Sequence, residues 1–156
     1  MLRTKSETAE PAKSVKGSPK IAIIGCGAVA EIFYLPALAK HPSVLENLIL
    51  VDRNEERVQQ LSKKFNAKNY LLDHRDVLNR KVDGVIIAAP THLHHPIAMD
   101  FLAEGVHILC EKPLAVTADK AREMVKKARE TGAEILTNYH RRLYASYIKV
   151  KELLAD

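Results

Sequence analysis

A short apolar run that ends in closely spaced glycines is the clearest chemical feature of the chain. Residues 21–30 read Ile-Ala-Ile-Ile-Gly-Cys-Gly-Ala-Val-Ala, which is typical of a strand, a tight turn and the start of a helix. Gly25 would let the chain turn sharply, and Gly27 would let the backbone approach a pyrophosphate. Ala30 is small enough for close packing of the helix on the strand. Helix N-terminal N–H groups would then face the phosphates. The predicted phosphate-binding residues are Gly25, Gly27, Ala28, Val29 and Ala30. An ordinary tight turn is the alternative.

An acid after the next apolar run could hold the sugar of the same ligand. The run Leu48-Ile-Leu-Val ends at Asp52, roughly where a dinucleotide-binding unit places a carboxylate for the adenosine ribose hydroxyls. Alternatively, Asp52 is a capping or turn acid ahead of Asn54. Arg53 could hold a 2′-phosphate, whereas Asp52 repels one. We expect NAD as the cofactor, with NADP as the alternative.

The elements that must position these residues follow an alternating pattern. From Lys20 onward, apolar runs alternate with amphipathic stretches, which predicts a single α/β domain. We expect a Rossmann-type, doubly wound parallel sheet with helices on both faces. Pro36 should bend or end the first helix early, Asn54 and Thr117 should cap two others, and Gly132 should follow a last turn. The expected strands are 21–24, 48–51, 69–71, 84–89, 106–110 and 134–137. One expected helix covers residues 28–39, and another follows the fourth strand and reaches to about residue 103.

Composition narrows the class of protein. The chain has 156 residues, of which 47% are hydrophobic and 28% charged, as in one globular domain. No apolar run approaches the roughly 18 residues that a membrane span needs. The formal charge of +5 is spread along the chain, and only 5% of residues are aromatic. We therefore expect a solvated surface, with no nucleic-acid partner and no membrane partner.

The N-terminal residues and the cysteines indicate a cytoplasmic protein. Residues 1–19 are polar and have no hydrophobic period, which predicts a flexible tail without a secretory signal. Cys26 and Cys110 form no disulfide framework and should be small buried hydrophobes rather than redox groups. His92, His94 and His95 suggest a metal site, but no acid or thiol lies at ligand spacing, so we expect none.

Three motifs together resemble one known family. They are the glycine turn, Ala-Ala-Pro90-Thr-His-Leu-His94 after the fourth predicted strand, and Cys-Glu111-Lys112-Pro113-Leu-Ala after the fifth. With them the chain resembles the Gfo/Idh/MocA family of NAD(P)-dependent oxidoreductases, which act mainly on sugars, inositols and related polyols. The resemblance runs from about Lys20 to the C-terminus, and the Glu-Lys-Pro motif is its most discriminating part.

The resemblance implies roles for individual residues. Lys112 would be the catalytic residue, reaching the substrate hydroxyl and the nicotinamide ribose, while Pro113 fixes the turn. An ammonium against a carbonyl oxygen stabilises the alkoxide that develops during reduction. Alternatively, Lys112 is an exposed lysine before a turn proline. The further cofactor-binding residues that the resemblance implies are Ala89, Pro90, Thr91, His94, Glu111 and, more weakly, Arg142.

The weaker match near Arg142 has specific causes. Asn138 stands where the family usually has glycine, Leu143 where an aromatic residue is usual, and Ala145 where proline often occurs. Arg141 and Arg142 could instead be surface charges.

Family members continue into a second domain that supplies substrate contacts. We therefore expect a tail at 1–19, an NAD(P)-binding domain at 20–143 and a linking helix at 144–156, with the chain excised or truncated and catalytically incomplete alone. The leading hypothesis is the nucleotide domain of an oxidoreductase that acts on a sugar or polyol. The alternatives are a stand-alone nucleotide-binding module or partner subunit, and a domain that binds S-adenosylmethionine. A bare surface could also support a homo-oligomer.

Overall fold

Six parallel strands form one sheet in the computed structural model, which describes residues 17–155. The order β3-β2-β1-β4-β5-β6 is that of a doubly wound Rossmann sheet, so the predicted fold class is confirmed. Of the predicted tail, residues 17–19 are described, and residues 1–16 lie outside the described part of the chain. The strands are β1 (Ile21–Ile24), β2 (Ile49–Val51), β3 (Asn69–Leu71), β4 (Gly84–Ile87), β5 (His107–Glu111) and β6 (Ile135–Asn138).

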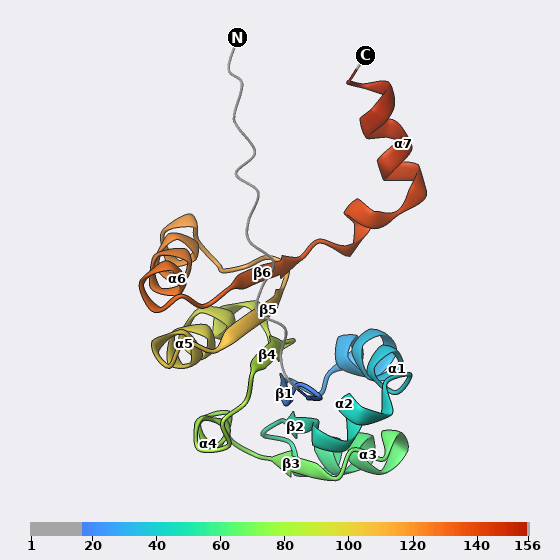
Figure 1. Ribbon diagram of the computed structural model, residues 1–156, viewed down its shortest axis with the longest axis vertical. Coiled ribbons are helices and arrows are strands. Elements are labelled where there is room, and N and C mark those ends of the chain that lie inside the picture. Colours follow the sequence, from blue (N-terminus) through green and yellow to red (C-terminus); the bar gives the residue numbers. More distant parts are fainter. Residues whose placement is uncertain (1–16, 156) are drawn as a thin grey trace.

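Helices cover both faces of the sheet (Figure 1). One face carries α1 (Leu35–Leu38), α2 (Pro42–Asn47) and α3 (Glu55–Phe65). The other carries α4 (Arg75–Leu78), α5 (Thr91–Ala103) and α6 (Ala118–Thr131). The last helix, α7 (Ala145–Leu153), stands apart from both layers after β6 (Figure 1).

Alternate residues of each central strand enter opposite cores. In β1, Ile23 packs into the cluster under α1 and α3, whereas Ala22 and Ile24 pack into the cluster under α5 and α6. Successive strand side chains point to opposite faces, so a strand covered on both sides must be apolar throughout. This explains why the central strands read as unbroken hydrophobic runs.

The helix caps predicted at Asn54 and Thr117 are present in the structure. The Asn54 side chain accepts a hydrogen bond of 3.0 Å from the Arg57 N–H at the start of α3, and Thr117 accepts one of 3.4 Å from Lys120 at the start of α6. Gly132 ends α6 in the left-handed region at φ 73°. These contacts satisfy backbone groups that have no partner inside the helix.

The segment around Pro36 departs from a simple helix. Residues Ala30–Tyr34 form a π-helical turn, which continues into α1, and α1 ends at Leu38. Proline lacks an N–H and its ring crowds the carbonyl of Ile32, four residues earlier, so a regular α-helix cannot pass through this point. The wider turn accommodates Pro36 and carries Tyr34 at its end.

Other boundaries moved by one or two residues. The fourth strand ends at Ile87 rather than residue 89, and the fifth includes Glu111. The short helices α2 and α4 were not predicted, because elements of six and four residues show no helical period.

Candidate functional site

The glycine turn is tightly enclosed at its first glycine. Gly25 has φ 103°, and a Cβ atom there would lie 2.6 Å from the carbonyl oxygen of Ala88. The Gly25 N–H donates a 2.8 Å hydrogen bond to the Val51 carbonyl. Gly25 thus sits between the ends of β2 and β4, where both the backbone conformation and the available space require glycine.

The second glycine has open space beside it. A Cβ atom at Gly27 would meet no atom within 4 Å among the described residues. The Glu31 N–H bonds to the Gly27 carbonyl at 3.1 Å, so the N–H groups of Ala28 and Val29 come before this bond at the helix start. Ala30 is fully buried, as its small size predicted. An anion above the turn would meet backbone N–H groups without obstruction by a side chain.

Asp52 joins the end of β2 to this turn. Its Oδ2 accepts a 2.7 Å hydrogen bond from the Cys26 N–H, and its Oδ1 accepts one of 2.9 Å from the Asn54 N–H. The second contact is the turn-acid geometry considered above as the alternative. The first ties the carboxylate to the glycine turn, so Asp52 has both features.

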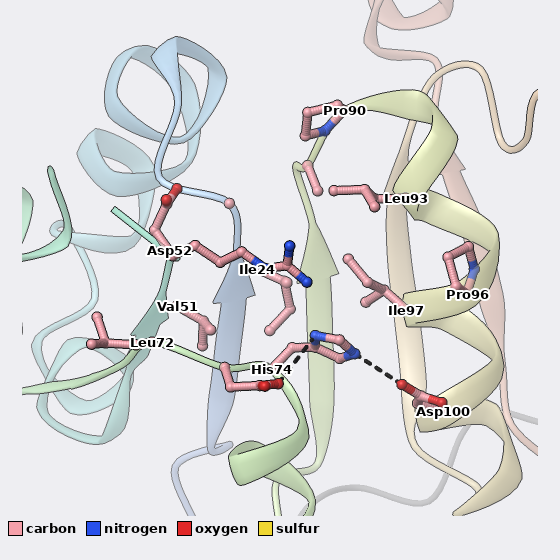
Figure 2. Close-up of a pocket in the computed structure, with 14 residues that line it drawn as sticks. Ile24, Val51, Asp52, Leu72, His74, Pro90, Leu93, Pro96, Ile97 and Asp100 are labelled. Carbon is pink, nitrogen blue, oxygen red and sulfur yellow. Dashed lines mark hydrogen bonds and ion pairs between the residues drawn. The ribbon is translucent and has the colours of Figure 1, made fainter. Parts of the chain in front are cut away.

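A pocket of about 250 Å³ lies beside the turn, at the carboxyl ends of β1, β2 and β4; we call it the strand-end pocket (Figure 2). Apolar side chains form much of its wall, including Leu72, Leu93 and Ile97. Polar groups stand around them, among them Asp52 and His74. An apolar pocket with a few polar groups is typical of a small-molecule site. Its lining includes the predicted site residues Gly25, Asp52, Arg53, Ala89 and Pro90.

One histidine of this pocket, His74, was not predicted as a site residue from the sequence. His74 Nε2 lies 2.8 Å from Asp100 Oδ2, and His74 Nδ1 lies 3.6 Å from Asp73 Oδ1 (Figure 2). Hydrogen bonds from Arg75 hold the pKa of the Asp73 carboxyl well below its usual range. The sequence carries a signal for this site, because an Asp-His-Arg triplet begins two residues after the end of a predicted strand.

A second missed residue supports the glycine turn from α3. Arg57 Nε donates a 2.8 Å hydrogen bond to the Cys26 carbonyl, and its Nη2 lies 2.5 Å from Glu31 Oε2. Lys64 lies 2.6 Å from the other Glu31 oxygen. Hydrogen bonds from Lys64 and Arg57 lower the pKa of Glu31 to about 2. These contacts join the first helix, the turn and α3.

Glu111 holds the segment that carries Lys112. Its Oε1 accepts 2.7 Å hydrogen bonds from Tyr34 Oη and from Asn138 Nδ2, and its Oε2 accepts one of 3.3 Å from the Lys112 N–H. Asn138 also donates to Tyr34 Oη at 2.8 Å. Burial and the hydrogen bond to Glu111 raise the pKa of Tyr34. Both Glu111 oxygens have protein partners, so this side chain supports the segment. It is not in the lining of the strand-end pocket, and its direct contact with the cofactor stays a prediction.

The family resemblance implied that His94 lines the cleft. Its side chain is only 1% exposed. Nε2 lies 2.8 Å from the Ala89 carbonyl oxygen, and Nδ1 lies 2.9 Å from that of Pro113. Because both ring nitrogens are engaged by backbone, the side chain connects two segments, and its contact with the cofactor stays a prediction.

The other predicted site residues, Pro90, Thr91, Lys112, Pro113 and Arg142, lie in loops, turns or the start of a helix. Pro90 precedes α5 as its N-cap, and Thr91 is the first residue of that helix. The Lys112 side chain is exposed, and no ion pair within residues 17–155 involves it. The Lys112–Pro113 peptide bond is cis. Arg142 is exposed in a 3₁₀ turn, His140–Leu143, and is not in the lining of the strand-end pocket.

Both cysteines are buried, as predicted. Burial raises the pKa of each thiol to about 12, and the charges of Asp52 and Glu111 add to this effect at Cys26 and Cys110 respectively. Such thiols stay protonated near neutral pH. Over the described part of the chain, no group of three or more His, Cys, Asp or Glu residues could hold a metal ion, and no helix has the length and apolar character to cross a membrane.

Comparison with known proteins identifies the family. A family model for an oxidoreductase family with an NAD-binding Rossmann fold, Gfo/Idh/MocA, matches residues 19–139. The chain is 30% identical to D-glucoside 3-dehydrogenase of Escherichia coli over 138 residues, which are 88% of this chain and 39% of that protein.

Two solved structures are similar in fold. The WlbA dehydrogenase of Bordetella pertussis, in complex with NADH and UDP-GlcNAcA, has a TM-score of 0.81 at 25% identity, covering 89% of this chain and 40% of that one. A 3-ketoreductase of Actinomadura kijaniata, in complex with NADP and TDP-benzene, has a TM-score of 0.79 at 27% identity, covering 88% and 42%. The chain thus spans about two-fifths of the length of these proteins. Its glycine turn, Glu-Lys-Pro segment and strand order, together with the match over residues 19–139, show that it belongs to the Gfo/Idh/MocA oxidoreductase family and carries its NAD-binding Rossmann fold.

Proposed function

We propose that the chain binds a nicotinamide dinucleotide across the carboxyl ends of its strands. The pyrophosphate would lie over the turn Gly25–Ala30, and the adenosine would enter the strand-end pocket. The observation that carries this proposal is Asp52, whose carboxylate contacts the glycine turn and also lines that pocket. The open space beside Gly27 suits the close approach of a phosphate to the backbone.

We propose NAD as the preferred form of the cofactor. The Asp52 carboxylate can accept hydrogen bonds from ribose hydroxyls and repels a 2′-phosphate. Arg53 also lines the pocket and is exposed, so NADP is the second possibility to be tested. The two similar structures, one with NADH and one with NADP, justify testing both.

The proposed activity is hydride transfer between the cofactor and a CH–OH carbon of a sugar, inositol or related polyol. The bound cofactor supplies the hydride chemistry. The exposed Lys112 ammonium would donate a hydrogen bond to the substrate oxygen and stabilise the negative charge that develops there. The named activity of the E. coli relative, on D-glucosides, supports a sugar substrate.

Residues 20–143 would be the nucleotide-binding domain, and 144–156 would lead toward a substrate domain. In support, α7 stands apart from the sheet and exposes apolar side chains such as Ile148 and Leu153 (Figure 1). We also propose a cytoplasmic location, since two free cysteines suit a reducing compartment. A homo-oligomer that covers apolar surface is a further proposal.

Calorimetric titration of the chain with NADH, NADPH and S-adenosylmethionine tests the cofactor proposal. We expect saturable binding of NADH, weaker binding of NADPH and none of S-adenosylmethionine. Gly27→Val should abolish the binding, because valine would fill the space reserved for the pyrophosphate. The exposed α6 variant Lys126→Ala is the control and should bind normally. A folded chain that binds neither nucleotide would contradict the proposal.

A further inference from the structure

His94 makes contacts that a neutral histidine cannot satisfy. Its two ring nitrogens lie 2.8 and 2.9 Å from the carbonyl oxygens of Ala89 and Pro113. A backbone carbonyl only accepts hydrogen bonds, and a neutral imidazole has one N–H to donate. In either neutral tautomer, one nitrogen would direct a lone pair at an oxygen lone pair at hydrogen-bond distance. If both ring nitrogens carry a proton, each N–H can donate a hydrogen bond to its carbonyl oxygen.

The two carbonyls belong to the segments that the proposed chemistry uses. Ala89 lines the strand-end pocket and precedes Pro90, while Pro113 directly follows Lys112. We infer that His94 is held as an imidazolium and acts as a positioning residue, which ties the Lys112 segment to the end of β4. The role of His94 in positioning Lys112 rests on the proposed function. The inference that both ring nitrogens of His94 carry a proton is independent of it.

The partners of His94 are the two carbonyl oxygens, and no ion pair among residues 17–155 includes it. Glu111, which is also buried, contacts Tyr34, Asn138 and the Lys112 N–H instead. On α5 itself, His92 is exposed, and His95 Nε2 lies 2.8 Å from Glu123 Oε2 on α6.

The two buried groups hold opposite sides of the Lys112–Pro113 pair. Glu111 accepts from the N–H of Lys112, and His94 donates to the carbonyl of Pro113. The backbone of the pair is therefore fixed before and after Lys112, while the lysine side chain stays exposed. A group fixed in this way loses little further freedom when it meets a substrate.

Nitrogen-15 NMR of the histidine side chains tests the protonation state directly in the wild-type chain at neutral pH. Single glutamine replacements of the other six histidines assign their signals and leave that of His94. We expect two protonated ring nitrogens for His94, with slow exchange of both protons. A signal with one protonated and one bare nitrogen would overturn the inference. Because the wild-type spectrum carries the result, it does not depend on whether a His94 variant folds.

The positioning role has its own test. His94→Gln can bond one carbonyl, so we expect displaced backbone amide signals at both Ala89 and Lys112, and about tenfold weaker NADH binding. His92→Gln is the matched control on the same helix and should change neither. A lower unfolding midpoint with both sets of signals unchanged would show a merely structural role. If the wild-type chain binds no NADH, the proposed function fails, and the nitrogen spectrum still decides the state of His94.

Discussion

The Asp52 carboxylate accepts a 2.7 Å hydrogen bond from the backbone N–H of Cys26, which joins the end of β2 to the glycine turn. Asp52→Ala removes this acceptor and leaves a part-buried N–H without its partner. We expect a loss of about 1–3 kcal/mol in the free energy of unfolding, measured with denaturant. The preference for NADH over NADPH should disappear as well. Asp52→Asn is the matched variant: its amide oxygen can keep the Cys26 bond but its NH2 group would face the Asn54 N–H, so stability should recover only in part while the cofactor preference stays lost.

The two glycines of the turn should respond differently to alanine. Gly25→Ala forces a Cβ to within 2.6 Å of the Ala88 carbonyl oxygen at φ 103°, so we expect a loss of about 2–4 kcal/mol in unfolding free energy. Gly27→Ala meets no atom within 4 Å in the described structure and should cost under about 1 kcal/mol. Chemical denaturation of both variants checks this. Equal stability of the two would contradict the geometry of the turn.

Tyr34 and Asn138 should act together on Glu111. Tyr34→Phe and Asn138→Ala each remove donors to the Glu111 carboxylate, and each should lower the unfolding free energy by about 1–3 kcal/mol. Because the two side chains also bond each other at 2.8 Å, the double variant should lose less than the sum of the single losses. A double-mutant cycle measures this coupling. Strict additivity would mean that the contacts do not form one network.

Acid should weaken the contact between the first helix and α3. Hydrogen bonds from Lys64 and Arg57 lower the pKa of Glu31 from 4.5 to about 2 in the folded chain. A lowered folded pKa means that this stabilisation is present above pH 4.5 and is lost as the pH falls toward 2. Glu31→Gln should therefore be less stable at neutral pH and lose less stability between pH 5 and 2. Glu46→Gln, an exposed control on α2, should follow the wild-type pH profile in denaturation curves.

Patterns local in sequence predicted most of the fold. The apolar runs of β1 and β4, the caps Asn54 and Thr117, and the glycine turn each depend on neighbouring residues. The π-helical turn could not be predicted in detail, because a proline can also simply end a helix.

The site was predicted less completely than the fold. The glycine motif and Asp52 follow from spacing, and the structure brings both to one pocket. The burial of His94 and the Tyr34–Glu111–Asn138 contacts depend on residues far apart in the chain, which periodicity does not reveal. The family resemblance implied that His94 lines the cofactor cleft, and its side chain in this structure is buried.

The contact between Asn138 and Tyr34 spans 104 residues of chain and therefore affects the order in which the molecule can fold. Such a contact forms only after β6, the strand at one edge of the sheet, has paired with β5. During synthesis, the Lys112 segment would stay without one of its supports until the end of the sheet had left the ribosome. Chains that stop short of β6 would lack the Asn138 contact to Glu111, so they should hold the lysine less firmly in its native orientation.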